Sequence, residues 1–141
     1  MLAVIAVNIM VIAVVVVIHY EFLYRFTVLM PHMEVRHRFR IVFGVLGALA
    51  AHALEVWVFA LFYFWMHQTQ GWGHFEGNFE GTLLDCAYFS FTTYTTLGIG
   101  DIAPHGKMRY LVGLEALTGF VLITWTASFL YLEMTRYWDR D

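Results

Sequence analysis

Residues 92–101 read T-T-Y-T-T-L-G-I-G-D, with four threonines, two glycines and an aspartate in a chain that is otherwise mostly apolar. Gly98 and Gly100 stand two apart, and glycine alone takes left-handed backbone angles at little cost. Left-handed angles at alternate residues would turn successive carbonyl groups the same way. With the Thr96 hydroxyl, four carbonyl oxygens could then replace the hydration shell of a cation; they belong to Thr96, Leu97, Gly98 and Ile99. The spacing predicts cation coordination by oxygen.

A short helix should precede this segment. Thr82 and Asp85 have the spacing of a capping box, with Asp in place of Glu or Gln, and an apolar run follows them. A helix over 82–95 is roughly 20 Å long, too short for a bilayer core of ~30 Å, and is predicted to be re-entrant. Non-helical backbone at membrane depth is tolerated only in protein or beside water, so a pore is implied. The negative C-terminal end of the helix dipole also favours a cation.

The rest of the chain predicts a membrane protein. It has 141 residues, of which 60% are hydrophobic and 13% charged. Membrane-spanning helices are predicted within residues 1–30, from 41 to 66 and from 110 to 133. The single cysteine, Cys86, excludes an intrachain disulfide. The net charge of -3 is not gathered into a basic stripe, so we expect no nucleic-acid partner. We also expect no soluble small-molecule substrate.

The basic residues predict the topology. Six of the eight lie between the first two spans or after the third: Arg25, Arg36, Arg38, Arg40, Arg136 and Arg140. Positive charge collects on the cytoplasmic side. We therefore expect the C-terminus in the cytoplasm, with a basic interfacial segment at 31–40 and a short tail at 136–141. The N-terminus and a glycine-rich exposed loop at 67–81 would face outward.

The segment T-T-Y-T-T-L-G-I-G-D-I-A-P resembles the pore signature of the potassium-channel family, T-x-T-T-x-G-Y-G-D. The order of outer helix, pore helix, filter and inner helix across residues 41–135 is similar as well. The resemblance implies an all-α membrane fold with three transmembrane helices, a re-entrant pore helix and a filter loop. It is that of a small prokaryotic-type channel with one extra N-terminal helix, a homotetramer in the inner or plasma membrane.

The resemblance also assigns residues. Residues 96–101 would form the filter, with K⁺ as the permeant ion at Thr96–Ile99 and no other cofactor. Filter support would come from the outer-mouth residue Asp101 and from the pore-helix residues Thr92, Thr93, Thr95, Tyr88 and Phe89. Three positions depart from the usual pattern: Ile99 replaces a tyrosine, Thr92 a carboxylate that some members carry, and Tyr88-Phe89 a common tryptophan pair.

Ionisable residues also fall inside the predicted spans. His52 and Glu55 stand three apart on one face of the second span, and Glu115 lies in the third. They are candidates for gating or proton sensing, although a hydrogen-bonded pair that locks the outer to the inner helix is the favoured reading. Gly113 and Gly119 allow either helix bending or close helix packing.

Several other functions compete with selective K⁺ conduction. A weakly selective Na⁺/K⁺ pore is suggested by Ile99, and a non-conducting accessory channel subunit is a second alternative. An intramembrane aspartyl protease is the least favoured, because its Gly-x-Gly-Asp motif at 98–101 needs a second aspartate on another span. Only Asp85 lies near in sequence, on the short helix itself. We therefore expect no enzyme.

Overall fold

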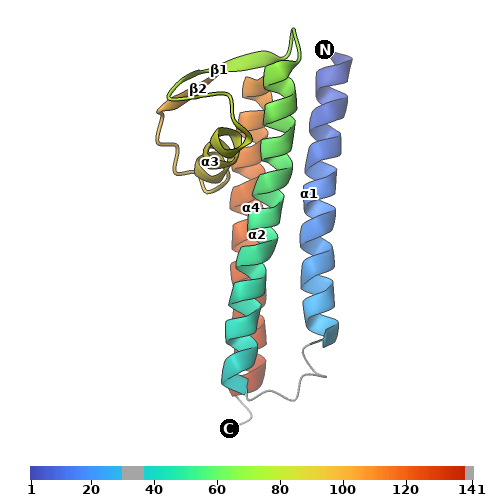
Figure 1. Cartoon of the computed structure of the whole chain (residues 1–141). Coiled ribbons are helices and arrows are strands. Elements are labelled where there is room, and N and C mark those ends of the chain that lie inside the picture. Colours follow the sequence, from blue (N-terminus) through green and yellow to red (C-terminus); the bar gives the residue numbers. More distant parts are fainter. Residues whose placement is uncertain (30–36, 139–141) are drawn as a thin grey trace.

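The computed structural model describes residues 1–29 and 37–138 of the chain. In this part, three long helices form a bundle, and a short helix and a two-stranded sheet lie at one end of it (Figure 1). The elements in chain order are α1 (Leu2–Leu29), α2 (His37–Gln68), β1 (Gly73–Gly77), α3 (Leu83–Tyr94), β2 (Ile102–Gly106) and α4 (Met108–Trp138).

The three long helices are long and apolar enough to cross a membrane, over Leu2–Leu29, Phe39–Gln68 and Met108–Arg136. α1 lies on the side of the α2–α4 pair away from α3 (Figure 1). Two glycines of α2 make the α1 contact close. A Cβ at Gly44 would lie 2.7 Å from the Phe26 ring, and one at Gly47 would lie 2.9 Å from the Phe22 ring. Aromatic rings of α1 thus fill notches in α2.

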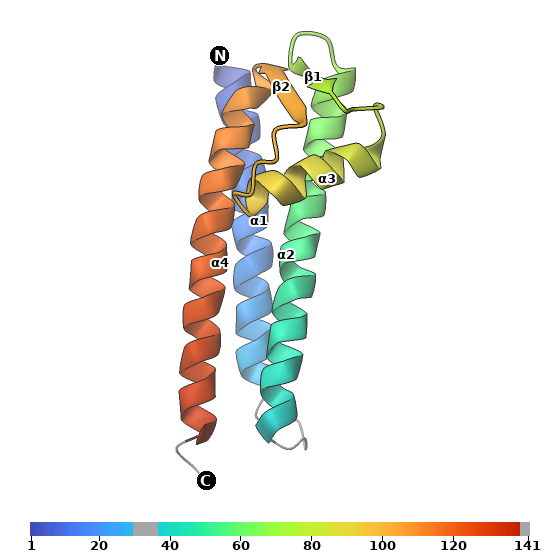
Figure 2. The same ribbon diagram turned by 90° about the vertical axis from the view of Figure 1, so that its left-hand side faces the viewer.

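α3 begins at a capping box. The Thr82 side chain accepts a hydrogen bond from the Asp85 amide, and the Asp85 carboxylate accepts one from the Thr82 amide. The same carboxylate accepts a second bond from the Glu80 amide, and these backbone donors lower the pKa of Asp85. In Figure 2, α3 slants toward the middle of the bundle, and the chain then turns back alongside α4 to β2. The helix is therefore re-entrant in shape.

The glycine-rich segment 67–81 differs from the exposed loop that its sequence indicates. Within it, β1 pairs antiparallel with β2, and Phe75 lies opposite Pro104. Phe75 is buried and packs against the rings of Phe79 and Phe89. The glycines permit this pairing, because a Cβ at Gly73 would lie 2.1 Å from the His105 carbonyl oxygen. The strand was missed because its partner lies on the far side of the pore helix in sequence.

Parts of two predicted segments fall outside the description. Of the basic segment 31–40, residues 37–40 form the start of α2, and 31–36 lie outside the described residues. Of the predicted tail 136–141, residues 136–138 belong to α4, and 139–141 lie outside the described part of the chain. The predicted spans 41–66 and 110–133 fall within α2 and α4.

Candidate ion-coordination site

The backbone after α3 alternates between left-handed and other conformations. Thr96, Gly98 and Gly100 have φ values of 59°, 54° and 83°. Thr96 is the one residue other than glycine with a positive φ in the described part of the chain. An L-residue pays roughly 1–2 kcal/mol for such angles, so the surroundings must hold Thr96 in place. The glycine spacing predicted the second and third of these positions, whereas no sequence signal indicated Thr96.

Two backbone hydrogen bonds fix the start of this loop to the last turn of α3. The Thr96 amide donates to the Thr93 carbonyl at 2.9 Å, and the Gly98 amide donates to the Thr92 carbonyl at 2.9 Å. Two of the supporting threonines use their hydroxyl groups within α3: Thr92 donates to the Phe89 carbonyl and Thr95 to the Phe91 carbonyl. Backbone groups, rather than threonine hydroxyls, therefore set the loop's starting geometry.

The far end of the loop is held by Asp101. Its carboxylate accepts a hydrogen bond of 3.0 Å from the Tyr88 hydroxyl, which raises the pKa of that phenol. Its backbone carbonyl accepts one of 2.9 Å from the Asn78 amide. Of the predicted aromatic pair, Tyr88 thus ties α3 to the outer end of the loop. Phe89 is buried instead, with its ring edge-on to Tyr63.

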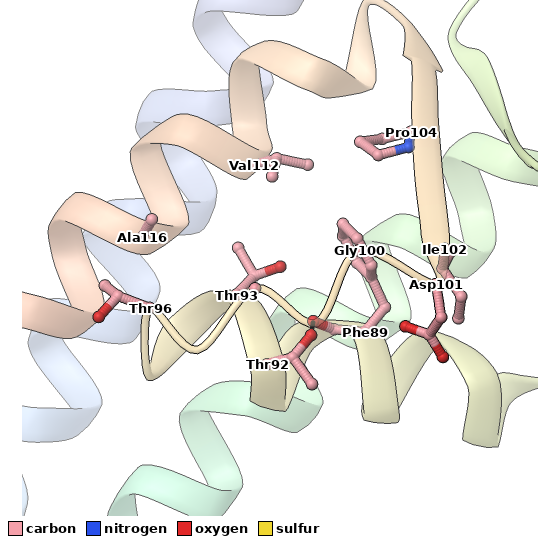
Figure 3. A pocket seen from close by; sticks show the side chains of 11 residues that line it. Phe89, Thr92, Thr93, Thr96, Gly100, Asp101, Ile102, Pro104, Val112 and Ala116 are labelled. Carbon is pink, nitrogen blue, oxygen red and sulfur yellow. Dashed lines mark hydrogen bonds between the residues drawn. The ribbon is translucent and has the colours of Figure 1, made fainter.

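A hollow of about 320 Å³ opens between the loop and α4 (Figure 3). Val112 and Ala116 line it from α4, and Thr93 from the last turn of α3. The loop lines it through Thr96, Gly98 and Gly100. In the single chain residues 95–100 are exposed, including the apolar Leu97 and Ile99. One face of the loop therefore lacks a cover within this chain.

Glu115 is fully buried behind the pore helix. Its carboxylate accepts hydrogen bonds from the hydroxyls of Tyr63 on α2 and Ser90 on α3. Ser90 also contacts the Val56 carbonyl at 3.0 Å. Glu115 therefore joins α4 to both neighbouring helices at one point.

His52 and Glu55 belong to a larger polar cluster than their spacing suggests, buried except for the half-buried His52. His52 Nδ1 lies 3.0 Å from a Glu55 oxygen, and His52 Nε2 lies 3.1 Å from the Thr126 hydroxyl of α4. Glu55 also contacts His19 of α1 at 2.9 Å and the Tyr94 hydroxyl at the end of α3. One nitrogen of each histidine and one Glu55 oxygen lie within 4.8 Å of one another.

The sequence did not predict that His19, Tyr94 and Thr126 belong to this cluster. A signal for His19 exists in the helical spacing of the buried face of α1, which is Asn8, Val11, Val15, His19 and Leu23. A polar residue on such a face needs a polar partner. Which partner it meets depends on how α1 docks, and the spacing leaves that open.

The two inner-helix glycines differ in surroundings. A Cβ at Gly119 would lie 2.1 Å from the Tyr94 carbonyl oxygen, whereas one at Gly113 would meet nothing within 4 Å. Gly119 therefore allows α4 to approach the end of the pore helix closely. Both glycines lie inside the continuous helix α4.

Comparison with known proteins assigns a family to this architecture. The family described as "ion channel" matches residues 51–136, which cover the second half of α2, the whole of α3 and the loop after it, and nearly all of α4. The chain belongs to this ion-channel family. The inward rectifier potassium channel Kirbac3.1 of Paramagnetospirillum magnetotacticum is 39% identical over 57 residues, or 40% of this chain and 19% of that protein. No solved structure matches the chain.

These findings confirm the resemblance to the potassium-channel pore-domain family and the mainly helical membrane fold. With three apolar helices, the chain is a multi-pass membrane protein. Membership of an ion-channel family indicates a transporter rather than an enzyme. The chain spans about a fifth of the length of the relative that it matches, and α1 lies outside the residues that the family match covers.

Proposed function

We propose that this chain is a subunit of a K⁺-selective channel, which conducts K⁺ passively through a filter formed by residues 96–100. The observation that carries the proposal is the left-handed backbone at Thr96, Gly98 and Gly100. Alternation of this kind directs successive carbonyl oxygens toward one side of a strand. Such oxygens replace the water of a dehydrated cation.

A homotetramer follows from the same loop. One loop cannot surround an ion, and four copies about an axis give the closed oxygen rings of a cation filter. The exposed apolar side chains of Leu97 and Ile99 support this assembly, because neighbouring copies would cover them. The arginine distribution supports a cytoplasmic C-terminus and an outward-facing N-terminus in the inner or plasma membrane.

One alternative keeps the pore and weakens its selectivity. Ile99 lacks the hydroxyl with which the family's usual tyrosine can anchor the filter, which favours a pore that also admits Na⁺. The bond from Tyr88 to Asp101 favours the selective pore, because it holds the outer end of the loop from the pore helix. An accessory subunit without conduction is the other alternative.

Ion flux from liposomes tests conduction itself. Purified protein is reconstituted into vesicles loaded with K⁺, and efflux is followed while a protonophore balances the charge. We expect efflux to require the protein. Silent vesicles that contain correctly inserted protein would favour the accessory subunit.

A further inference from the structure

We propose that His19 of α1 is a positioning residue for the filter, acting through Glu55 and Tyr94, and that this contact chain holds one shared proton. The inference rests on the proposed filter. It gives a role to α1, which lies outside the family match at residues 51–136. Helix α1 would then stabilise the filter from within the same chain.

The contact chain runs from α1 to the filter. His19 Nδ1 lies 2.9 Å from Glu55 Oε1, and the Tyr94 hydroxyl donates to Glu55 Oε2. All three side chains are at most 1% exposed. Tyr94 is the last residue of α3 and stands two residues before Thr96. Displacement of Glu55 would therefore shift Tyr94 and, with it, the start of the left-handed backbone at Thr96.

A second set of contacts closes the cluster on the α4 side. The single hydroxyl of Thr126 lies 3.3 Å from His19 Nε2 and 3.1 Å from His52 Nε2. His52 Nδ1 in turn lies 3.0 Å from both Glu55 Oε2 and the Tyr94 hydroxyl. Four helices thus meet at one group of polar side chains, which are buried except for the half-buried His52.

The contacts require more protons than ordinary charge states supply. The two contacts to Thr126 need two protons, the His19–Glu55 contact needs one, and the triangle of His52, Glu55 and Tyr94 needs at least two. Two neutral imidazoles, a phenol, a hydroxyl and a carboxylate carry only four between them. One further proton completes every contact.

The extra proton also removes the net charge of the cluster. On His19 it makes an imidazolium beside the Glu55 carboxylate, and on Glu55 it makes a neutral acid that donates to His19. Both placements leave the buried cluster neutral, which a low-dielectric interior favours. When the proton leaves the His19–Glu55 contact, two lone pairs face each other between side chains that are at most 1% exposed. One contact must then open.

The groups that face the cluster come from every helix packed against it. They are His19 from α1, His52 and Glu55 from α2, Tyr94 from α3 and Thr126 from α4, with the Trp125 ring against His19. The nearby carboxylate of Glu115 is occupied by the hydroxyls of Tyr63 and Ser90. The proposed proton is therefore held among side chains that all four helices supply.

Reversal potentials under a K⁺/Na⁺ gradient at pH 6.5 and pH 9 test the inference. Wild type should admit more Na⁺ at pH 9, by about tenfold in relative permeability if one buried hydrogen bond opens. His19→Leu removes both nitrogens and should show raised Na⁺ permeability at both pH values. His19→Asn keeps a donor near Nδ1 and cannot titrate, so it should remain selective at both. Tyr20→Leu, at a 53% exposed neighbour, is the matched control and should behave as wild type.

Several outcomes would overturn the inference. One is a relative Na⁺ permeability that does not change with pH in wild type and is the same in His19→Leu as in Tyr20→Leu. If His19→Leu fails to assemble, the inference is overturned when the relative Na⁺ permeability of His19→Asn depends on pH as strongly as that of wild type. One equivalent of bound zinc that is lost in His19→Asn, and retained when the exposed His74 and His105 are both replaced by Asn, would assign the cluster to a metal instead.

A measurement without ion flux separates this inference from the proposed function. In ¹⁵N NMR spectra of selectively labelled protein, the His19 and His52 side chains should change together in one pH step, because both contact Glu55 and the Thr126 hydroxyl and loss of the shared proton rearranges these contacts. Independent steps would contradict the inference even in a conducting channel. A common step in a protein that conducts nothing would preserve the cluster and reject the filter.

Discussion

At the scale of single residues, the loop after α3 depends on three backbone conformations. Gly98 and Gly100 take left-handed angles without a steric penalty, whereas Thr96 takes one as an ordinary L-residue. Amide bonds from Thr96 and Gly98 to the last turn of α3 hold the first part of the loop. In the proposed filter, the absence of a Cβ at Gly98 and Gly100 would allow the carbonyl groups to face inward.

Gly98→Ala is expected to abolish K⁺ flux while membrane insertion stays intact. Alanine at a φ of 54° costs about 1 kcal/mol or more and favours a flip of the adjacent peptide, which would turn a carbonyl away from the ion. Gly71→Ala is the matched control, because Gly71 has a φ of 84° and equally open space but lies outside the loop. Liposome flux measures both variants. Normal conduction by Gly98→Ala would remove residues 96–100 from the filter.

At the scale of elements, three local contacts fix the positions of the helices. A capping box begins α3, Phe22 and Phe26 seat α1 on the glycines of α2, and Gly119 brings α4 against the end of α3. The capping box and the Gly119 contact act on the two ends of α3. Substitutions at Asp85 and at Gly119 test the two ends of α3 separately.

Asp85→Asn should lower the stability of the pore helix at neutral pH. Because the pKa of Asp85 is depressed in the folded protein, the carboxylate stabilises the fold above its ordinary pKa of 3.8, and this contribution is lost as pH falls through the lower folded value. Thermal unfolding in detergent, monitored at pH 7 and near pH 3, measures it. The gap in melting temperature between wild type and variant should shrink in acid. A gap of equal size at both pH values would mean that the cap does not depend on the charge.

Gly119→Ala should push α4 away from the pore helix. The new methyl group would lie 2.1 Å from the Tyr94 carbonyl oxygen, and such overpacking typically costs about 1–3 kcal/mol. Gly113→Ala adds the same group in open space on the same helix and should be nearly neutral in stability. Unfolding temperature and flux are compared for the pair. Equal behaviour would show that α4 does not depend on this close approach.

The sequence predicts elements better than their contacts, for physical reasons. Apolar length predicts the three long helices, and the Thr82–Asp85 spacing predicts where α3 begins, because both signals are local. Strand β1 was hidden, since its glycines resemble a loop and its partner β2 comes only after the filter. The His19–Glu55 contact joins residues 36 apart, and docking of α1 alone decides it. The roles of the filter residues remain predictions.

At the scale of the whole molecule, the proposed pore requires more than one copy of the chain. The loop is exposed on one side, and a hollow beside it is lined by α3, the loop and α4. A lipid-facing filter would leave polar backbone in hydrocarbon, which is strongly disfavoured. Assembly about an axis resolves this, and the pore would then lie between chains.

Native mass spectrometry of the detergent-solubilised protein should give the mass of four chains. Leu97→Asp, which places a charge on the exposed face of the loop, should reduce the tetramer fraction if neighbouring copies cover that side chain. Leu84→Asp, at a side chain that is 70% exposed near the start of α3, controls for added charge. A monomer or dimer in the wild-type spectrum would rule out the fourfold filter.

The most direct test of the central claim is the reversal potential of the reconstituted wild-type protein with K⁺ on one side of the bilayer and Na⁺ on the other. A K⁺-selective filter at residues 96–100 predicts a potential close to the K⁺ equilibrium value, despite Ile99. A potential near zero, with Na⁺ carried as readily as K⁺, would contradict the claim.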